Sequence, residues 1–484
     1  MLGNLINFTE PSKNSFYFSF IIVIIVIILL IQLIIEILKE SEGKLNHNKI
    51  LSLYSSSPED HECPLDIKNQ KNILISRYLL VFAITRSTMW AKIPYLYALF
   101  MIVHKFSFAE IGFLFLIFSI GQLILGPIIF TLTYKFGCKL YCHIYNFSTI
   151  IEILLLIQGK RPLAYIAIII ASGFDIRFLN SIFETWLLSE SEKIFRNFRA
   201  EEKLFRENLF LKSNKYGAFI SIITCIICAF IYTYFGITYP FGLSILLNLS
   251  SSIVIQIFLE EKNLLRLQSY LNNYRILEIR YKFKKMDILC IGLIEGLVMA
   301  CLNIYLFSWT PILKQSTPGG MNVGFIFMAM ALSFLMGTKM YELLIDYWIF
   351  DYHTSITINL LLQGLILFLV YCINNFLTRM IFLSLFNALF GFYSPLIDLI
   401  KSNILNEEYK STIMNLFSIP TNVYIIVIFL HLNYMNCFTL ALISSIICLI
   451  AFLIGMILVI YQFLIYSEEN IEYEDFIRLL HEGN

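Results

Sequence analysis

The segment "EEKNLLRLQSYLNNYRILEIRYKFKK" (Glu260–Lys285) divides the 484-residue chain into two apolar parts. Seven long apolar runs precede this polar, basic segment, and six follow it. The whole sequence is 58% hydrophobic and only 14% charged. A soluble protein covers its core with a polar shell, so this composition predicts a polytopic, all-α membrane protein.

The apolar runs are long enough to cross a bilayer as helices, which takes about 20 residues each. The first, "FYFSFIIVIIVIILLIQLIIEIL" (Phe16–Leu38), lacks a small-residue cleavage site and is too long for a secretory signal, so we expect an anchoring helix. The thirteen predicted spans are 16–38, 78–102, 109–133, 140–158, 163–188, 214–235, 240–259, 286–309, 322–342, 354–373, 378–400, 412–432 and 437–462.

The spans fall into groups of one, six and six, with polar segments between the groups. Two six-helix halves joined by a basic linker match the architecture of the major facilitator superfamily, whose halves enclose a cavity at mid-membrane. The predicted regions are the outer N-terminus with an extra helix (1–38), a cytoplasmic linker (39–77), an N-terminal half (78–259), a basic cytoplasmic linker (260–285), a C-terminal half (286–462) and an acidic cytoplasmic tail (463–484).

Lys and Arg predict the orientation, because they accumulate on the cytoplasmic side. If 39–77, 134–139, 189–213, 260–285, 338–353, 401–411 and the C-terminus face the cytoplasm, that side holds 26 of the 35 basic residues, with membrane-edge residues such as Lys215 included. The outer side then holds six, Lys13, Lys105, Lys160, Arg161, Lys314 and Arg379, and the helix interiors hold three, Arg86, Lys92 and Arg177. We therefore expect an outer N-terminus and a cytoplasmic C-terminus, in the plasma membrane. The basic linker is then expected to anchor against anionic lipid.

Other classes of function find little support in the sequence. The net charge of +1 does not favour nucleic-acid binding, and no P-loop, H-E-x-x-H or G-x-S-x-G motif favours an enzyme. The C-x-x-C at Cys225–Cys228 lies in an apolar run without other ligands nearby, so we expect packing cysteines rather than a metal or redox site. No cofactor or metal is expected. Six cysteines in apolar runs are expected to pack there: Cys225, Cys228, Cys290, Cys301, Cys372 and Cys448.

Short motifs in a fixed order suggest a narrower family. They are "PYLYALF" (Pro94–Phe100), "FSFAEIGFLF" (Phe106–Phe115), "SIFETWLLSE" (Ser181–Glu190), "FSWTPIL" (Phe307–Leu313), "GFIFMAMALSFLMGTKMY" (Gly324–Tyr341), "GFYSP" (Gly391–Pro395) and "STIMNLFSIPTN" (Ser411–Asn422). Together they resemble the molybdate-anion transporter family, a branch of the major facilitator superfamily. The resemblance implies a monomeric secondary transporter that moves a small oxyanion, molybdate first, by alternating access, with one helix before a twelve-helix core.

The sequence also departs from the pattern of that family. In "GPIIFTLTYKFGCK" (Gly126–Lys139), Lys135, Gly137 and Lys139 match the superfamily's turn, but Tyr134 and Cys138 replace its Asp and Arg. Other departures remove charges that could bind substrate or couple ions. Another small anion, an organic solute, or a non-transporting sensor or scaffold with the same fold therefore remain alternatives.

The stretch "SGFDIRFLNSIFETWLLSE" (Ser172–Glu190) carries charges in an apolar run. Arg177, Ser181 and Glu184 are spaced 4 and 3 residues apart, which places them on one helical stripe. Three hypotheses for Glu184 are an ion pair between helices, a substrate or proton-coupling role, and a position near the cytoplasmic interface. Trp186 suits an interfacial belt, which favours the third in part.

Two cations, Arg86 and Lys92, lie in the first core span. An oxyanion needs positive donors, and Arg is the better bidentate partner. Alternatively, Arg86 pairs with a carboxylate such as Glu295, and Lys92 extends outward to the membrane surface.

In the superfamily, the first, fourth, seventh and tenth core helices line the cavity, and nearly every deep polar group of this sequence lies on one of them. Tyr393 and Pro395, on the tenth, allow a helix break near a gate. The residues expected at the substrate cavity are Arg86, Trp90, Lys92, Tyr95, Arg177, Ser181, Glu184, Glu295, Asn303, Asn387 and Tyr393. Those expected in gating or structural motifs are Lys135, Gly137, Lys139, Trp186, Asn415 and Pro420.

Overall fold

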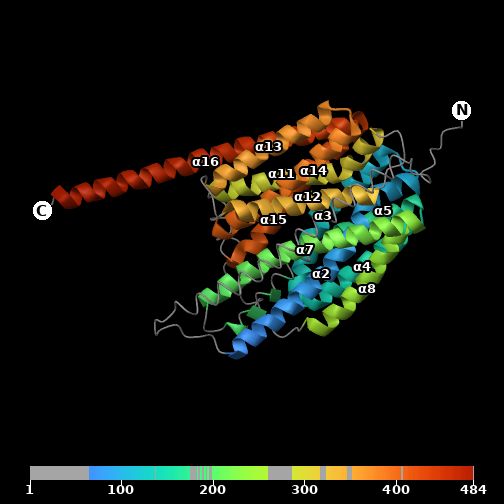
Figure 1. Ribbon diagram of the computed structural model, residues 1–484, viewed down its shortest axis with the longest axis horizontal. Coiled ribbons are helices and arrows are strands. Elements are labelled where there is room, and N and C mark those ends of the chain that lie inside the picture. The colour runs from blue at the N-terminus through green and yellow to red at the C-terminus, as the bar shows by residue number, and fades with distance from the viewer. Residues whose placement is uncertain are drawn as a thin grey trace. The chain divides into compact units, whose positions relative to one another are not determined.

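The computed structural model describes residues 65–136, 138–174, 183, 186–187, 190–191, 193–195, 199–259, 286–316, 323–345, 351–404 and 407–482. Within these residues the chain forms twelve α-helices and one 3-10 helix, and no strand (Figure 1). The all-α prediction is confirmed. The predicted first span, 16–38, and the linker 260–285 lie outside the described residues.

Each of the twelve α-helices overlaps one predicted core span, in order. Their bounds are α2 Leu65–Ile102, α3 Phe108–Phe136, α4 Cys138–Ile157, α5 Arg161–Gly173, α7 Arg199–Phe235, α8 Tyr239–Phe258, α11 Met286–Gln315, α12 Val323–Ile345, α13 Tyr352–Cys372, α14 Phe376–Ile404, α15 Glu407–Leu430 and α16 Cys437–Glu482; the 3-10 helix η1 is Leu432–Tyr434.

Three helices extend into segments that the sequence predicted as linkers, loops or tail. α2 begins within the predicted linker 39–77, α7 begins within the predicted loop 189–213, and α16 runs to Glu482 through the predicted tail. These extensions are polar but rich in Glu, Lys, Leu and Arg, which are strong helix formers. The end of an apolar run therefore marks where a helix leaves the apolar environment, not where the helix stops.

Length and composition identify eight membrane-spanning helices among the described residues, in α3, α4, α8, α11, α12, α13, α14 and α16. Shorter apolar helices occupy α5 and parts of α7 and α15. α2, whose apolar part carries Arg86 and Lys92, is not among the eight. The multi-pass membrane class follows from this repeated apolar pattern.

The chain forms two compact units. The first comprises the described residues of Met1–Tyr95, Phe183–Leu247 and Thr317–Leu332, and the second those of Leu96–Ile182, Asn248–Ser316 and Ser333–Asn484. Their boundaries differ from those of the two predicted halves, so the division at 260–285 stays a prediction. Within the second unit, α11 packs against α14, α15 and α16, and α13 packs against α14 and α16 (Figure 1).

Glycines bring two helices of the second unit into backbone contact. A Cβ on Gly337 of α12 would lie 1.8 Å from the carbonyl oxygen of Ala388 of α14. A Cβ on Gly391 of α14 would lie 2.0 Å from the carbonyl oxygen of Phe334. Small residues allow this close approach in membrane proteins, where van der Waals packing drives helix association. The contact fixes the middle of α14 against α12.

Candidate functional site

Of the charged residues in the stretch 172–190, the structure describes Glu190. Arg177, Ser181, Glu184 and Gly137 lie outside the described residues. Lys135 and Asn415 lie on α3 and α15, but only their backbone positions are described. The three hypotheses for Glu184 therefore stay predictions.

α2 carries four of the predicted cavity residues, all in the first unit. The Arg86 guanidinium lies 5.0 Å from the centroid of the Phe82 ring, a cation–π distance. Lys92 is only 7% exposed, and the Trp90 ring lies 5.7 Å from that of Phe327 on α12. The burial of Lys92 contradicts the expectation that its side chain extends to the surface.

Tyr95 lies where three helices of the first unit meet. It is 0% exposed, and its ring centroid is 5.4 Å from that of Tyr232 on α7. A Cβ on Gly324 of α12 would lie 2.3 Å from the Tyr95 hydroxyl and 2.8 Å from the Cβ of Ala229 on α7. Tyr95 therefore packs so closely against α12 that only glycine fits at position 324.

Trp186 is buried within the first unit rather than exposed. Its side chain is 5% exposed and stacks on Tyr78 of α2, with ring centroids 6.4 Å apart. The expectation of a place in an interfacial belt is wrong, because aromatic packing against α2 covers the indole. Its assignment to a structural motif remains compatible with this position.

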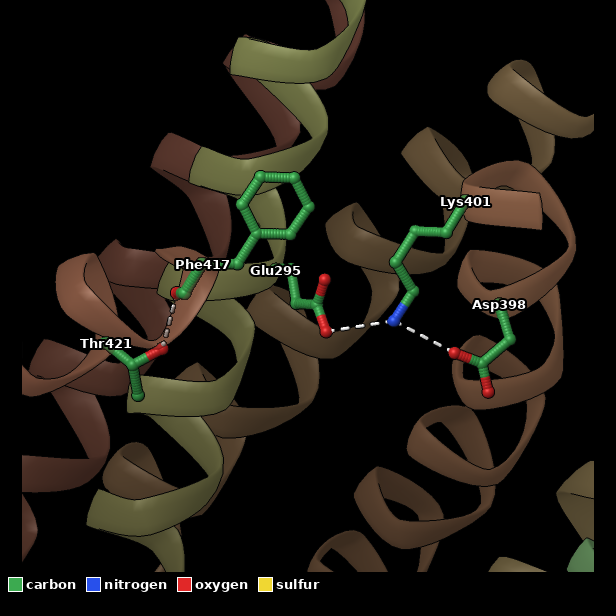
Figure 2. Close-up of polar contacts among 5 residues, drawn as sticks. All are labelled: Glu295, Asp398, Lys401, Phe417 and Thr421. Carbon is green, nitrogen blue, oxygen red and sulfur yellow. Dashed lines mark hydrogen bonds and ion pairs between the residues drawn. The ribbon is translucent and has the colours of Figure 1, made fainter. Parts of the chain in front are cut away.

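An ion-pair network joins α11 to α14 in the second unit. Figure 2 shows the Lys401 ammonium between two carboxylates, 2.9 Å from Glu295 Oε1 and 2.9 Å from Asp398 Oδ1. The side chains are 3%, 13% and 46% exposed for Lys401, Glu295 and Asp398. The alternative pairing of Glu295 with Arg86, which lies in the first unit, stays a prediction. Lys401, assigned to the cytoplasmic segment 401–411, instead lies buried in the last turn of α14.

The helix face around Glu295 packs against α15. A Cβ on Gly292 would lie 2.4 Å from the Phe417 ring, and one on Gly296 would lie 2.9 Å from Pro420. Thr421 donates a hydrogen bond of 3.4 Å to the Phe417 carbonyl (Figure 2). Pro420, expected in a structural motif, therefore packs beside Glu295.

Two polar atoms near this network are buried and have no hydrogen-bond partner among the described residues. One is Oε2 of Glu295, and the other is the hydroxyl of Tyr393. Tyr393 is 0% exposed and lies within electrostatic range of both Glu295 and Asp398. A buried polar atom without a partner is costly, so these two atoms lower the stability of the contact between α11 and α14.

A neutral contact joins the same two helices at a second level. The Asn387 side-chain amide donates to the Tyr305 hydroxyl, and also at 2.8 Å to the Leu383 carbonyl of its own helix. Asn303 instead donates to the Met299 carbonyl at 2.8 Å. Asn387 therefore links α14 to α11, whereas the described hydrogen bond of Asn303 stays within α11.

Lys139, from the predicted gating turn, contacts another helix of the second unit. Its ammonium donates to the Gln256 carbonyl of α8 at 3.0 Å, and the Gln256 side chain lies 3.1 Å from the His143 ring. This motif residue thus holds α4 to α8.

Arg379 was assigned by sequence to the outer surface, but it is 2% exposed in α14. Its guanidinium donates to the Val370 carbonyl at 3.3 Å, to Asn374 at 2.7 Å and to the Ser316 hydroxyl. It also lies 4.2 Å from the Phe438 ring centroid. Its position at the very start of the predicted span 378–400 gave no signal of burial.

Deep polar groups also lie on helices outside the predicted cavity set. Asn146 and Glu152 on α4, and Asn359 and Gln363 on α13, are buried. Asn146 donates to Ser251 on α8 at 3.1 Å, and Gln363 to Asn359 at 2.7 Å. The expectation that such groups concentrate on cavity helices is wrong, because polar side chains of neighbouring helices can satisfy one another.

The described cysteines are mostly buried, as expected, with the exception of Cys372 at the end of α13. The Cys301 and Cys448 sulfurs, on α11 and α16, lie 3.4 Å apart. Within the described residues, no three His, Cys, Asp or Glu side chains are grouped so as to hold a metal ion.

Comparison with known proteins identifies the class of function. Residues 48–386 match the family model MFS_5, described as 12 TM sugar transporters. The chain belongs to this family. It is therefore a secondary transporter of the major facilitator superfamily, and its relatives by family are transporters rather than enzymes. No curated protein matches the sequence.

Solved structures share the fold at low sequence identity. The nucleoside transporter NupG is 13% identical, with a TM-score of 0.60 over 79% of this chain and 98% of its own. The peptide transporter PepTSo is 11% identical, with a TM-score of 0.60 over 79% and 97%. A D-xylose-proton symporter is 13% identical, with a TM-score of 0.60 over 80% and 96%. These structures establish the fold and leave the substrate open.

Proposed function

We propose that this transporter moves a small oxyanion, molybdate first, by alternating access between the two sides of the membrane. The observation that carries the proposal is the pair of cations on α2. Lys92 is 7% exposed, and Arg86 lies one and two-thirds turns before it on the same helix. A cation inside a membrane helix costs about 2.5–3.5 kcal/mol on insertion scales, so a cation at such a position indicates a functional site.

The chemistry of these side chains fits an oxyanion. A guanidinium presents a planar fork of donors to two oxygens, and an ammonium adds a compact positive charge. The motifs from Pro94 to Asn422 that resemble the molybdate-anion transporter family support the same substrate class. The remaining cavity residues predicted from the sequence are proposed here as its surroundings.

A second candidate is an organic solute such as a sugar. The description of the matching family as sugar transporters favours it. The aromatic side chain of Trp90, between the two cations on α2, also suits the apolar face of a sugar ring. Influx of the two substrate classes separates the candidates.

The test is influx of labelled molybdate into cells that lack their own molybdate transporter. We expect saturable influx above that of cells with an empty vector, and competition by sulfate. Arg86→Ala should lower influx about 10- to 100-fold, because a hydrogen bond to a charged group contributes about 1.5–3 kcal/mol. Lys193→Ala, which removes an exposed cation paired with Glu190, is the matched control and should leave influx unchanged.

Two outcomes contradict the oxyanion. Influx of a labelled sugar without influx of molybdate would support the second candidate. No influx of molybdate, sulfate or a broad panel of solutes, at normal amounts of protein in the membrane, would favour the non-transporting alternative.

We also propose that the transporter is a monomer in the plasma membrane, with its N-terminus outside and its C-terminus in the cytoplasm. The excess of basic residues in the segments 39–77 and 260–285 supports this orientation. An epitope at the N-terminus should bind antibody on intact cells, and one at the C-terminus only after permeabilisation.

A further inference from the structure

A cation and a thioether meet where α2 and α11 end, within the second unit. The Lys314 ammonium, in the last turn of α11, donates to the sulfur of Met101, in the last turn of α2, at 3.2 Å. Both side chains are half-buried. A thioether sulfur is a weak acceptor, whereas an oxygen that accepts from an ammonium makes a strong, charge-assisted hydrogen bond. An oxygen at the place of this sulfur would therefore bind Lys314 more tightly.

Aromatic packing brings the two helix ends together. The ring centroid of Tyr97, one turn before Met101, lies 5.6 Å from that of Phe307 on α11, in an edge-on arrangement. The Phe307 ring also lies 5.1 Å from the Phe115 ring of α3. Both Tyr97 and Phe307 are buried. Packing of these rings therefore fixes how close Met101 and Lys314 lie, and the weak hydrogen bond between them adds little.

The contact joins segments from the two predicted halves, 78–259 and 286–462. Alternating access moves one half against the other. A side-chain contact between the halves then has to open and close in each transport cycle. A stronger bond between Met101 and Lys314 would keep the ends of α2 and α11 together for longer and slow the cycle.

Met101 is also open to a small oxidant. Its side chain is half-buried, and the neighbouring Val103 and Lys105 are exposed. Oxidation of a thioether to a sulfoxide needs no deprotonation, and it is reversible by methionine sulfoxide reductases. The facing thiols of Cys301 and Cys448 differ in both respects, because they are 0% exposed and a buried thiol is inert.

We propose that Met101 is a site of reversible oxidation by peroxides, and that its sulfoxide ties α2 to α11 through Lys314. Hydrogen peroxide transfers one oxygen atom to the sulfur: the O–O bond breaks, an S–O bond forms and water leaves. The sulfur is oxidised by two electrons and the peroxide is reduced by two. The flexible Met side chain can turn the new oxygen to the Lys314 ammonium. The effect on transport rests on the proposed function, whereas the modification and the new hydrogen bond do not.

Mass spectrometry tests the modification. Purified full-length protein in vesicles is treated with hydrogen peroxide, and its peptides should show one added oxygen at Met101 that methionine sulfoxide reductase removes. Met435, half-buried after η1, is the internal comparison. Oxidation of Met435 without oxidation of Met101 would overturn the proposal.

Amide hydrogen exchange tests the new bond without any substrate. Oxidation should slow exchange in the last turns of α2 and α11 about tenfold, since a hydrogen bond to a charged group shifts an equilibrium by about this factor or more. Met101→Gln, whose amide oxygen imitates the sulfoxide, should slow exchange without peroxide. Met101→Leu should not respond to peroxide, and Met435→Leu should respond as the wild type does. Equal slowing in Lys314→Leu, or none in the fully oxidised wild type, would overturn the role of Lys314.

Transport by vesicles tests the consequence. Oxidised wild type should exchange labelled molybdate about tenfold more slowly than untreated protein, and the reductase should restore the rate. Met101→Leu should keep its rate in peroxide. An unchanged rate in wild type whose amide exchange has slowed would overturn the effect on the cycle. Absence of molybdate exchange in untreated wild type would contradict the proposed substrate, and the mass and the amide exchange would still decide the modification site.

Discussion

Two cations are buried near opposite ends of α14, and the polar groups that surround them differ. Arg379 is 2% exposed, and its hydrogen bonds within the described part of the chain go to neutral oxygens, with an aromatic ring against its guanidinium. Lys401 is 3% exposed and contacts two carboxylates. The two positions are 22 residues apart, a helical rise of about 33 Å, which is close to the thickness of the hydrocarbon core.

The difference separates a charge held by dipoles from a charge held by opposite charges. A guanidinium stays protonated in proteins, and the carbonyl, amide and hydroxyl that accept from Arg379 do not titrate near neutral pH. The hydrogen bonds of Arg379 are therefore the same in acid and in base. The partners of Lys401 are two carboxylates, so an ionic link holds this end of α14 to α11.

The largest effect is expected from Lys401→Met. Removing the ammonium leaves Glu295 buried and uncompensated, and breaking a buried pair in this way costs about 3–5 kcal/mol. We expect a matching loss in the free energy of unfolding in detergent at neutral pH. Lys401→Arg keeps the charge and is the control. A loss no larger than the 0–1 kcal/mol typical of an exposed ion pair would contradict the distinction between the two ends.

Arg379→Gln should cost about 2–3 kcal/mol, because the described hydrogen bonds of a buried charged group are lost together with a cation–π contact. The loss should be the same at pH 5 and pH 8. Arg379→Lys, which keeps the charge but not the planar fork, should recover only part of it. Chemical unfolding of both variants at the two pH values measures this. A strongly pH-dependent loss would mean that a titratable group lies against Arg379.

The sequence predicts the helices well because apolar runs of about 20 residues have few alternatives to a membrane helix. It does not predict that these two cations are buried. Arg379 and Lys401 both lie at the edges of apolar runs, where counting of Lys and Arg treats a cation as facing water. Glu295 could be singled out because it is a carboxylate inside an apolar run. Its partner, 106 residues further along the chain, depends on how α11 and α14 pack, which periodicity does not encode.

The hydrogen bond between Asn387 and Tyr305 also joins α11 to α14, but it involves no charged group. Tyr305→Phe removes the hydroxyl that accepts the Asn387 amide hydrogen, and Asn387 keeps its bond to the Leu383 carbonyl. We expect a loss of about 1 kcal/mol in the free energy of unfolding, the usual value for a hydrogen bond between neutral groups. The loss should not depend on pH. A much larger loss would indicate that this contact, rather than the Glu295–Lys401 pair, holds α11 to α14.

The smallest effect is expected from Asp398→Asn, and it tests whether the two carboxylates on Lys401 are equivalent. Asp398 is 46% exposed and lies on the same helix as Lys401, three residues before it. Exposed ion pairs of this kind contribute about 0–1 kcal/mol, and added salt screens them. The variant should therefore unfold nearly as the wild type does, at low and at high salt, while Lys401 keeps its contact with Glu295. If Asp398→Asn instead destabilised the protein as much as Lys401→Met, the exposed carboxylate would be the one that compensates the ammonium.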